Sequence, residues 1–159
     1  MAENQLDVRG MDKATAYRAL REQLDAVLDG VTDPIAVMST MATILHFGFG
    51  FLWTGFYRVT SPAKLTVGPY QGALGCLEIE FGKGVCGTVA STRQTVIVPD
   101  VRAFAGHIVC DARARSEIVV PVFDLRGALK AVLDIDSAEV GAFDGEDRRQ
   151  LEAWVARLS

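Results

Sequence analysis

The spacing of apolar residues changes once along this chain, close to residue 51. Before this point the apolar residues recur at three- and four-residue intervals: Tyr17, Leu20, Leu24, Val27 and Leu28. This period predicts an amphipathic helix over residues 12–29, which Asp12 can cap and Gly30 can end. A second, more apolar helix is predicted to begin at Asp33-Pro34 and to run to about residue 47.

After residue 51 the apolar residues alternate with other residues, which is the period of β-strands. The strands are predicted over residues 51–59, 64–72, 95–100, 116–124 and 127–137. A short helix is predicted over 84–92, and a C-terminal helix over about 144–158. Two helices, a run of strands and a closing helix predict an α+β fold, with an antiparallel sheet and helices packed on one face.

The size and charge of the chain exclude several classes of protein. Its 159 residues are half apolar, which is enough for one domain with its own core. The 16 basic and 20 acidic residues form no long basic run, so no nucleic-acid partner is expected. The polar N-terminus lacks the pattern of a secretory signal, and the most apolar stretch is too short to span a membrane. We therefore expect a cytoplasmic protein with no membrane partner.

Three cysteines, Cys76, Cys86 and Cys110, are an odd number for a disulfide-stabilised secreted domain. They form no CxxC pair, and the chain has only two histidines, so no metal site is expected. In a reducing compartment each cysteine can serve simply as a small buried hydrophobic residue. Composition alone does not exclude that structural role.

Cys110 stands out because it lies in a long loop, predicted over residues 100–115, that is too apolar at GHIVC for a disordered segment. His107, Arg113 and Arg115 flank it in the sequence. These side chains would favour the thiolate if they approached the sulfur, although the arginines can equally be solvated loop charges. The loop therefore carries a candidate nucleophile.

The last two strands carry three carboxylates. If Leu125-Arg126 is a two-residue turn, facing residues have numbers that sum to 251, and Glu117 faces Asp134. Asp136 then lies on the same face, diagonally close to Glu117. The alternative is that the strand ends at Leu133 and that Asp134 and Asp136 lie in a solvated turn. In a pocket, burial and repulsion would raise at least one pKa and leave a proton for general acid catalysis.

An aromatic strand precedes these elements and can form a wall of the same pocket. Trp53, Phe56 and Tyr57 lie on it. Trp53 and Tyr57 are candidate substrate-binding residues, and packing in the hydrophobic core is the competing role for each of the three.

The chain resembles the free methionine-R-sulfoxide reductases, which are enzymes built on a GAF domain. The segments that carry the resemblance are GPYQG, FGKGVCGTVAST, VPDVRAFAGHIVCD, SEIVVPVF and VLDIDS, in this order, within about residues 51–145. They include all three cysteines and all three carboxylates. The resemblance implies a single GAF domain over residues 1–159, with a loop-covered pocket on the sheet face opposite the helices.

The resemblance also implies a role for each site residue. Cys110 matches the catalytic cysteine that attacks the sulfoxide sulfur and becomes a sulfenic acid, and Cys76 matches the resolving cysteine that forms a disulfide with it. Cys86 matches an auxiliary or alternative resolving cysteine. Glu117, Asp134 and Asp136 match carboxylates that bind free methionine sulfoxide and assist proton delivery, with Glu117 and Asp136 as candidate catalytic acids.

By the same resemblance, thioredoxin reduces the disulfide, no cofactor is bound, and the chain can form a homodimer. The apolar stripe of the first helix is either a dimer surface or part of the core. Two other functions compete with this interpretation: a non-catalytic GAF sensor of small molecules, and a thiol-based redox sensor. Neither has an evident need for both the reactive thiol and the acidic patch.

Overall fold

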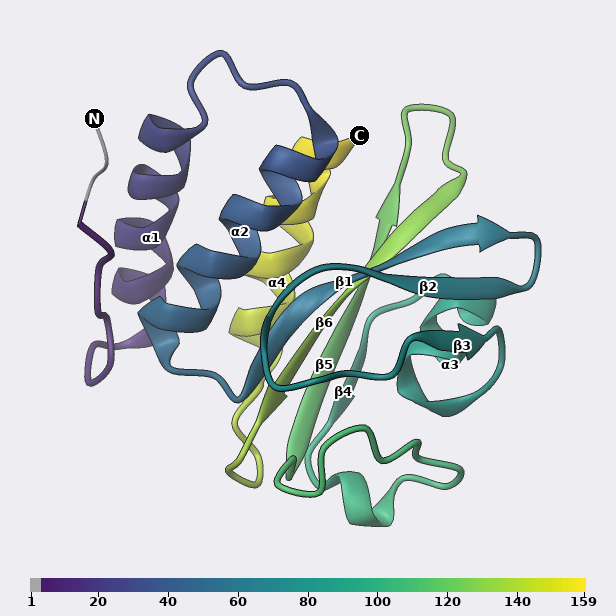
Figure 1. The fold of residues 1–159 in the computed structure, drawn as a ribbon. Coiled ribbons are helices and arrows are strands. Elements are labelled where there is room, and N and C mark those ends of the chain that lie inside the picture. The colour runs from purple at the N-terminus through teal and green to yellow at the C-terminus, as the bar shows by residue number, and fades with distance from the viewer. Residues whose placement is uncertain (1–3) are drawn as a thin grey trace.

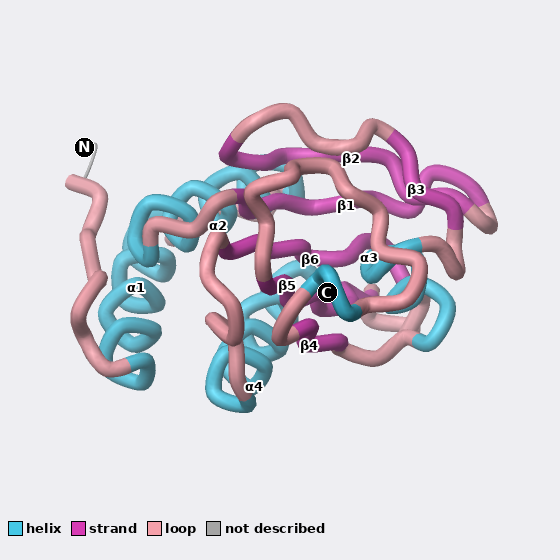
Figure 2. The backbone as a smooth tube through the Cα atoms, turned by 90° about the horizontal axis from the view of Figure 1, so that it is seen from below, coloured by secondary structure: helices cyan, strands magenta, loops and turns pink. Residues whose placement is uncertain are grey.

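The computed structural model describes residues 4–159, and a single six-stranded antiparallel sheet organises them (Figure 1). The strands are β1 (Trp53–Ser61), β2 (Lys64–Gly72), β3 (Glu78–Glu80), β4 (Val96–Val98), β5 (Ser116–Phe123) and β6 (Leu129–Ser137). Their spatial order is β3-β2-β1-β6-β5-β4, and Figure 2 shows this order from top to bottom for β2 through β4. The strands β1 and β6 therefore lie at the centre of the sheet.

The helices divide between the two faces of the sheet. They are α1 (Lys13–Val27), α2 (Pro34–Phe49), α3 (Gly84–Thr92) and α4 (Gly145–Val155), with short 3-10 turns at Val101–Ala103 and Ala156–Leu158. The helices α2 and α4 cover one face, α1 packs outside them, and α3 lies across the other face (Figures 1 and 2). The α+β architecture predicted from the sequence is confirmed.

Local capping explains where the first two helices begin. The Asp12 side chain accepts a hydrogen bond from the Thr15 amide at 3.0 Å, and the Asp33 side chain accepts one from the Ala36 amide at 2.8 Å. Pro34 occupies the first turn of α2, where its missing N–H has no partner to lose. Gly50, with φ of +72°, ends α2 in a left-handed conformation.

The apolar stripe of α1 is buried inside its own chain. Tyr17, Leu20 and Leu24 are inaccessible to solvent and belong to the core that α2, α4 and the sheet share. Ile118 and Leu133 enter this core from β5 and β6. Most of the stripe is therefore part of the core, and of its five predicted residues Val27, 42% exposed, is the one that reaches the surface.

The register of the β5–β6 hairpin differs from the predicted one by two residues. Glu117 faces Asp136, and Val119 faces Asp134, so the facing numbers sum to 253 and the predicted pairing of Glu117 with Asp134 is wrong. One extra residue lies in the turn, where the Asp124 amide donates a hydrogen bond to the Ala128 carbonyl. The other lies at a bulge between the Val122–Ala131 and Phe123–Leu129 pairs. Two one-residue shifts restore the original alternation, so the three carboxylates still share one face.

Strand β3 was not predicted from the sequence. It has three residues, pairs only with β2 at the edge of the sheet, and alternates between exposed and buried side chains. A segment this short, enclosed by glycines, carries too little periodicity to be distinguished from a loop. Within residues 4–159, no helix is both long and apolar enough to cross a membrane.

A buried carboxylate ties α4 to α1. Asp147, only 2% exposed, accepts a hydrogen bond from the Tyr17 hydroxyl at 2.8 Å and forms an ion pair with Lys13. It also accepts a bond from the Asp144 amide, while the Asp144 side chain caps α4 in return. The Tyr17 hydroxyl thus depends on a carboxylate that is shielded from water, and Lys13 shares its charge between this carboxylate and that of Asp144.

We expect Asp147→Ala to lower the free energy of unfolding by about 2 kcal/mol, because it leaves the buried Tyr17 hydroxyl without its acceptor and removes one of the two ion pairs of Lys13. The control is Glu22→Ala at an exposed position of α1, which should change the stability by about 0.5 kcal/mol or less. Urea denaturation of the two variants checks this. Equal stability losses would show that the buried carboxylate does not hold the two helices together.

Candidate active site

Glu117, Asp134 and Asp136 lie together on the sheet face opposite α2 and α4. Glu117 lies directly across from Asp136, and both aspartates belong to β6, where they are two residues apart. Glu117 and Asp134 are 5% and 6% exposed, and all three carboxylates line one pocket. The predicted clustering is therefore present, and Asp134 and Asp136 belong to the strand, not to a solvated turn.

Burial and mutual repulsion keep protons on this cluster. Burial, with the nearby charge of Asp136, raises the pKa of Glu117 from its ordinary 4.5 to about 8. Burial also raises the pKa of Asp134 and Asp136 well above the usual range, with Glu117 and Asp134 respectively as the next contributors. At neutral pH the pocket therefore holds carboxyl groups that can donate protons.

An aromatic stack forms the wall beside the carboxylates. Trp53 and Tyr57 from β1 stack with ring centroids 5.6 Å apart, and Trp53 stacks on Tyr70 of β2 at 5.1 Å. Trp53 and Tyr57 both line the pocket, whereas Phe56 faces the helix side and is core. Burial and the charge of Asp134 raise the pKa of Tyr57, so its hydroxyl remains protonated.

A glycine in β1 makes room for this wall. Gly55 lies opposite Asp134 on one side and opposite Tyr70 on the other. A Cβ atom at Gly55 would come within 2.3 Å of the Tyr70 Cβ and 2.7 Å of the Trp53 ring. The absence of a side chain thus allows the aromatic rings to close over the strand next to Asp134.

Cys110 is joined to Cys76 by a disulfide, with the Cα atoms 5.4 Å apart. Cys76 lies in the loop between β2 and β3, and Cys110 lies in the long loop that precedes β5. Of the two, only Cys110 lines the pocket that contains the carboxylates. The structure therefore brings the two cysteines together at the pocket, with Cys110 on the exposed loop at its edge and Cys76 half-buried behind it.

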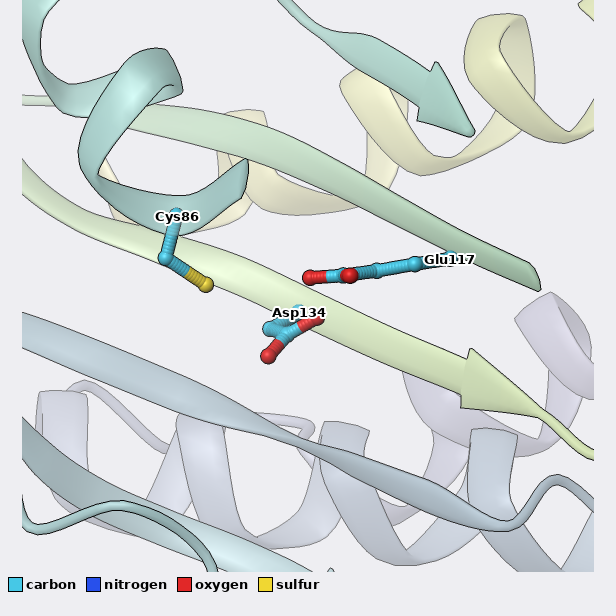
Figure 3. Close-up of side chains that lie close together, drawn as sticks. All are labelled: Cys86, Glu117 and Asp134. Atoms are coloured by element: carbon cyan, nitrogen blue, oxygen red, sulfur yellow. The ribbon is translucent and has the colours of Figure 1, made fainter. Parts of the chain in front are cut away.

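Cys86 is a free thiol buried below this disulfide, in the first turn of α3. Its sulfur and the carboxylates of Glu117 and Asp134 point toward one another (Figure 3), and one ligand atom from each lies within 4.8 Å of the others. Burial raises the pKa of Cys86 well above the usual range, and the charges of Asp134 and Glu117 raise it further. Cys86 is thus a protonated thiol, and this trio has donor types and a spacing that suit a metal ion.

The cationic residues around Cys110 engage carboxylates. Arg113 pairs with Asp111 at 2.7 Å, and Arg115 pairs with Asp100 at 3.7 Å. His107 reaches into the pocket, where its Nε2 lies 3.3 Å from Glu117 Oε2. Burial lowers the pKa of His107, so the ring is neutral near pH 7 and can exchange a proton with Glu117.

Asp111 is a pocket residue that the sequence analysis did not identify. It lines the pocket, and its charge adds to the raised pKa of Asp136. Its position directly after Cys110 was a usable signal, because a residue adjacent to a candidate nucleophile shares its loop. The apolar lining residues Leu74 and Ile108 offered no such signal.

The comparisons with known proteins agree on one family. Residues 18–158 match the model of the GAF domain. The free methionine-R-sulfoxide reductase of Escherichia coli is 37% identical over 149 residues, which cover 93% of this chain and 89% of that protein. The enzyme of the same name from Saccharomyces cerevisiae is also 37% identical, over 89% of this chain and 83% of its own length.

A solved structure supports the same relationship. The X-ray structure of free methionine-R-sulfoxide reductase from Neisseria meningitidis in complex with its substrate superposes with a TM-score of 0.91 at 39% identity. The match covers 98% of this chain and 93% of that one.

The raised pKa of Glu117 predicts a pH-dependent stability. The folded state holds the Glu117 proton more tightly than the unfolded state, so this contribution is complete below about pH 4.5 and is lost as the pH rises to about 8. Between these limits we expect the unfolding free energy of the oxidised wild type to fall by about 4 kcal/mol more than that of Glu117→Gln.

Urea denaturation across this pH range measures the difference. Glu22→Gln, on the exposed side of α1, is the matched control and should follow the wild-type curve. Parallel curves for Glu117→Gln and wild type would mean that Glu117 titrates near its ordinary pKa.

Proposed function

Because the chain belongs to the GAF-domain family of free methionine-R-sulfoxide reductases, we propose that it reduces free L-methionine-(R)-S-oxide to L-methionine at this pocket. The relatives make it an oxidoreductase that acts on a sulfoxide. The observation that carries the proposal is the disulfide of Cys110 with Cys76 beside three carboxylates, of which Glu117 and Asp134 are buried. A pocket that only sensed a ligand would need no paired thiols.

Cys110 is the proposed nucleophile. It lines the pocket whereas its partner Cys76 does not, and the other pocket thiol, Cys86, is held protonated by burial and by its acidic neighbours. The Cys110 thiolate attacks the sulfoxide sulfur, and the oxygen passes to Cys110 as a sulfenic acid. The Cys110 sulfur is oxidised by two electrons and the substrate sulfur is reduced by two, which releases methionine.

Glu117 is the proposed proton donor. A sulfoxide oxygen is a poor leaving group unless it is protonated, and a donor works best when its pKa lies near the working pH. The pKa of Glu117, about 8, meets this condition. The neutral His107 ring, 3.3 Å away, can relay a proton from solvent to Glu117 after each turnover. Asp136, directly opposite Glu117, keeps that proton in place by repulsion.

Asp134 is the proposed contact for the substrate ammonium. Its Oδ1 is buried and has no hydrogen-bond partner within the described chain, which leaves an acceptor available in the pocket. Methionine within a peptide has no free ammonium, so an enclosed acidic pocket selects the free amino acid. Trp53 and Tyr57 provide an apolar wall for the rest of the substrate.

Cys76 is the proposed resolving cysteine. Its thiol attacks the Cys110 sulfenic acid, which forms the disulfide and releases water. A dithiol protein of the thioredoxin type then reduces the disulfide to two thiols and becomes oxidised itself. The cycle needs no resident cofactor, because every electron passes through sulfur.

We expect methionine to be released from the free R-sulfoxide in the presence of thioredoxin or dithiothreitol, with much weaker turnover of the free S epimer and of peptide-bound sulfoxide. Chromatographic quantification of methionine from the three substrates checks this. Peptide-bound sulfoxide turned over as fast as the free form would refute a pocket that recognises the ammonium. An inert protein that still binds methionine sulfoxide would instead support a sensor.

The resolving role is tested by Cys76→Ser. We expect this variant to release about one methionine per active site and then to stop in the presence of thioredoxin, because the sulfenic acid has no partner thiol. Mass spectrometry after trapping should find the modification on Cys110. Cys110→Ser is the matched control and should release none. Sustained thioredoxin-dependent turnover by Cys76→Ser would transfer the resolving role to Cys86.

A further inference from the structure

Cys86 has no place in the proposed reaction, although it lies in the same pocket. It is the free cysteine of the described chain, 4% exposed, and its sulfur is directed at Glu117 and Asp134 (Figure 3). One sulfur and two carboxylate oxygens, all within 4.8 Å of one another, come from α3, β5 and β6. Three separate elements therefore converge on one small volume.

A second observation shows that one oxygen of this cluster lacks a partner. Asp134 is 94% buried, since only 6% of its surface is exposed, and its Oδ1 accepts no hydrogen bond within residues 4–159. An unsatisfied buried carboxylate oxygen is destabilising, and such atoms usually mark a bound ion, water or ligand.

The charge of the cluster points to a cation. In the part of the chain that the structure describes, the only ion pair of Glu117 and Asp134 is the contact of Glu117 with His107. Within residues 4–159 no lysine or arginine pairs with either carboxylate, so no fixed positive charge competes with a metal ion for them.

We infer that Cys86, Glu117 and Asp134 form a binding site for a thiophilic divalent cation, with Zn²⁺ as the best match. Thiolate, carboxylate and a compact three-ligand geometry suit Zn²⁺, whereas Mg²⁺ and Ca²⁺ require oxygen ligands. The Cys86 thiol loses its proton to solvent on binding, and no electron is transferred. His107, 3.3 Å from Glu117, is placed to orient that carboxylate from the outer shell.

Three protein ligands leave one zinc position open to water or another ligand, which differs from the four protein ligands of a structural zinc centre. The site shares Glu117 and Asp134 with the proposed contacts of the substrate. A consequence, which rests on the proposed function, is that Zn²⁺ and methionine sulfoxide exclude each other. Zinc would then act as a competitive inhibitor of the reductase.

Metal binding is tested without catalysis in the double variant Cys76→Ser/Cys110→Ser, in which Cys86 is the only thiol. Titration with Co²⁺ under anaerobic conditions should produce a thiolate-to-cobalt charge-transfer band that saturates at about one ion per chain, and Zn²⁺ should abolish it. Adding Cys86→Ser should remove the band. Absence of the band in the double variant, or a band that survives Cys86→Ser, would overturn the inference.

The carboxylate ligands are tested in the same double-variant background. Asp134→Asn and Glu117→Gln should each weaken Co²⁺ binding by about tenfold or more, and Glu22→Gln on the surface of α1 should leave it unchanged. Circular dichroism verifies that each variant is folded. Unchanged affinity in both Asp134→Asn and Glu117→Gln would overturn the assigned ligand set.

The effect of Zn²⁺ on turnover is measured separately in the wild type. Zn²⁺ should raise the apparent KM for methionine sulfoxide without changing kcat when a phosphine, not a thiol, is the reductant, because thiols would bind the metal. Cobalt binding by the double variant together with zinc-insensitive turnover would uphold the metal site and refute the competition. A wild type without reductase activity would refute the proposed function and leave the cobalt result standing.

Discussion

The pocket depends on the burial of three like-charged groups on two adjacent strands. Glu117 faces Asp136 across β5 and β6, and Asp134 follows on the same face. Directly opposed carboxylates destabilise a sheet, and burial adds to the destabilisation unless protons are retained. The sheet tolerates them because its other face joins a large apolar core through residues such as Ile118, Leu133 and Ile135. The stability supplied by that core permits a chemically reactive opposite face.

The thiols follow from the same arrangement. The acidic environment keeps Cys86 protonated, whereas Cys110 is carried on a loop at the mouth of the pocket and can meet Cys76 there. Cys86, which is buried in the pocket, and Cys110, which lies on the loop, therefore differ in reactivity because of their positions. Burial beside the carboxylates keeps the proton on Cys86, whereas Cys110 is exposed on its loop and forms the disulfide.

Much of this organisation could be predicted from the sequence, and the errors have identifiable causes. The caps at Asp12 and Asp33 and the alternation of β5 and β6 are local signals, and they located the helices and the shared face of the carboxylates correctly. The pairing partner of Glu117 was predicted wrongly because turn length and a bulge depend on backbone geometry that residue types do not specify. The contact of His107 with Glu117 joins a loop to a strand, so neighbouring residues in the sequence could not reveal it.

Trp53 connects the pocket wall with the segment that carries Cys76. Its ring stacks between Tyr57 and Tyr70, and its indole N–H donates to the Ala73 carbonyl at 3.1 Å, three residues before Cys76. The other tryptophan, Trp154, is fully buried in the core on the helix side. The indole of Trp53 therefore responds to changes in the pocket, and that of Trp154 responds to changes in the folded core. The intrinsic fluorescence of the protein contains separate optical signals for pocket events and for global unfolding.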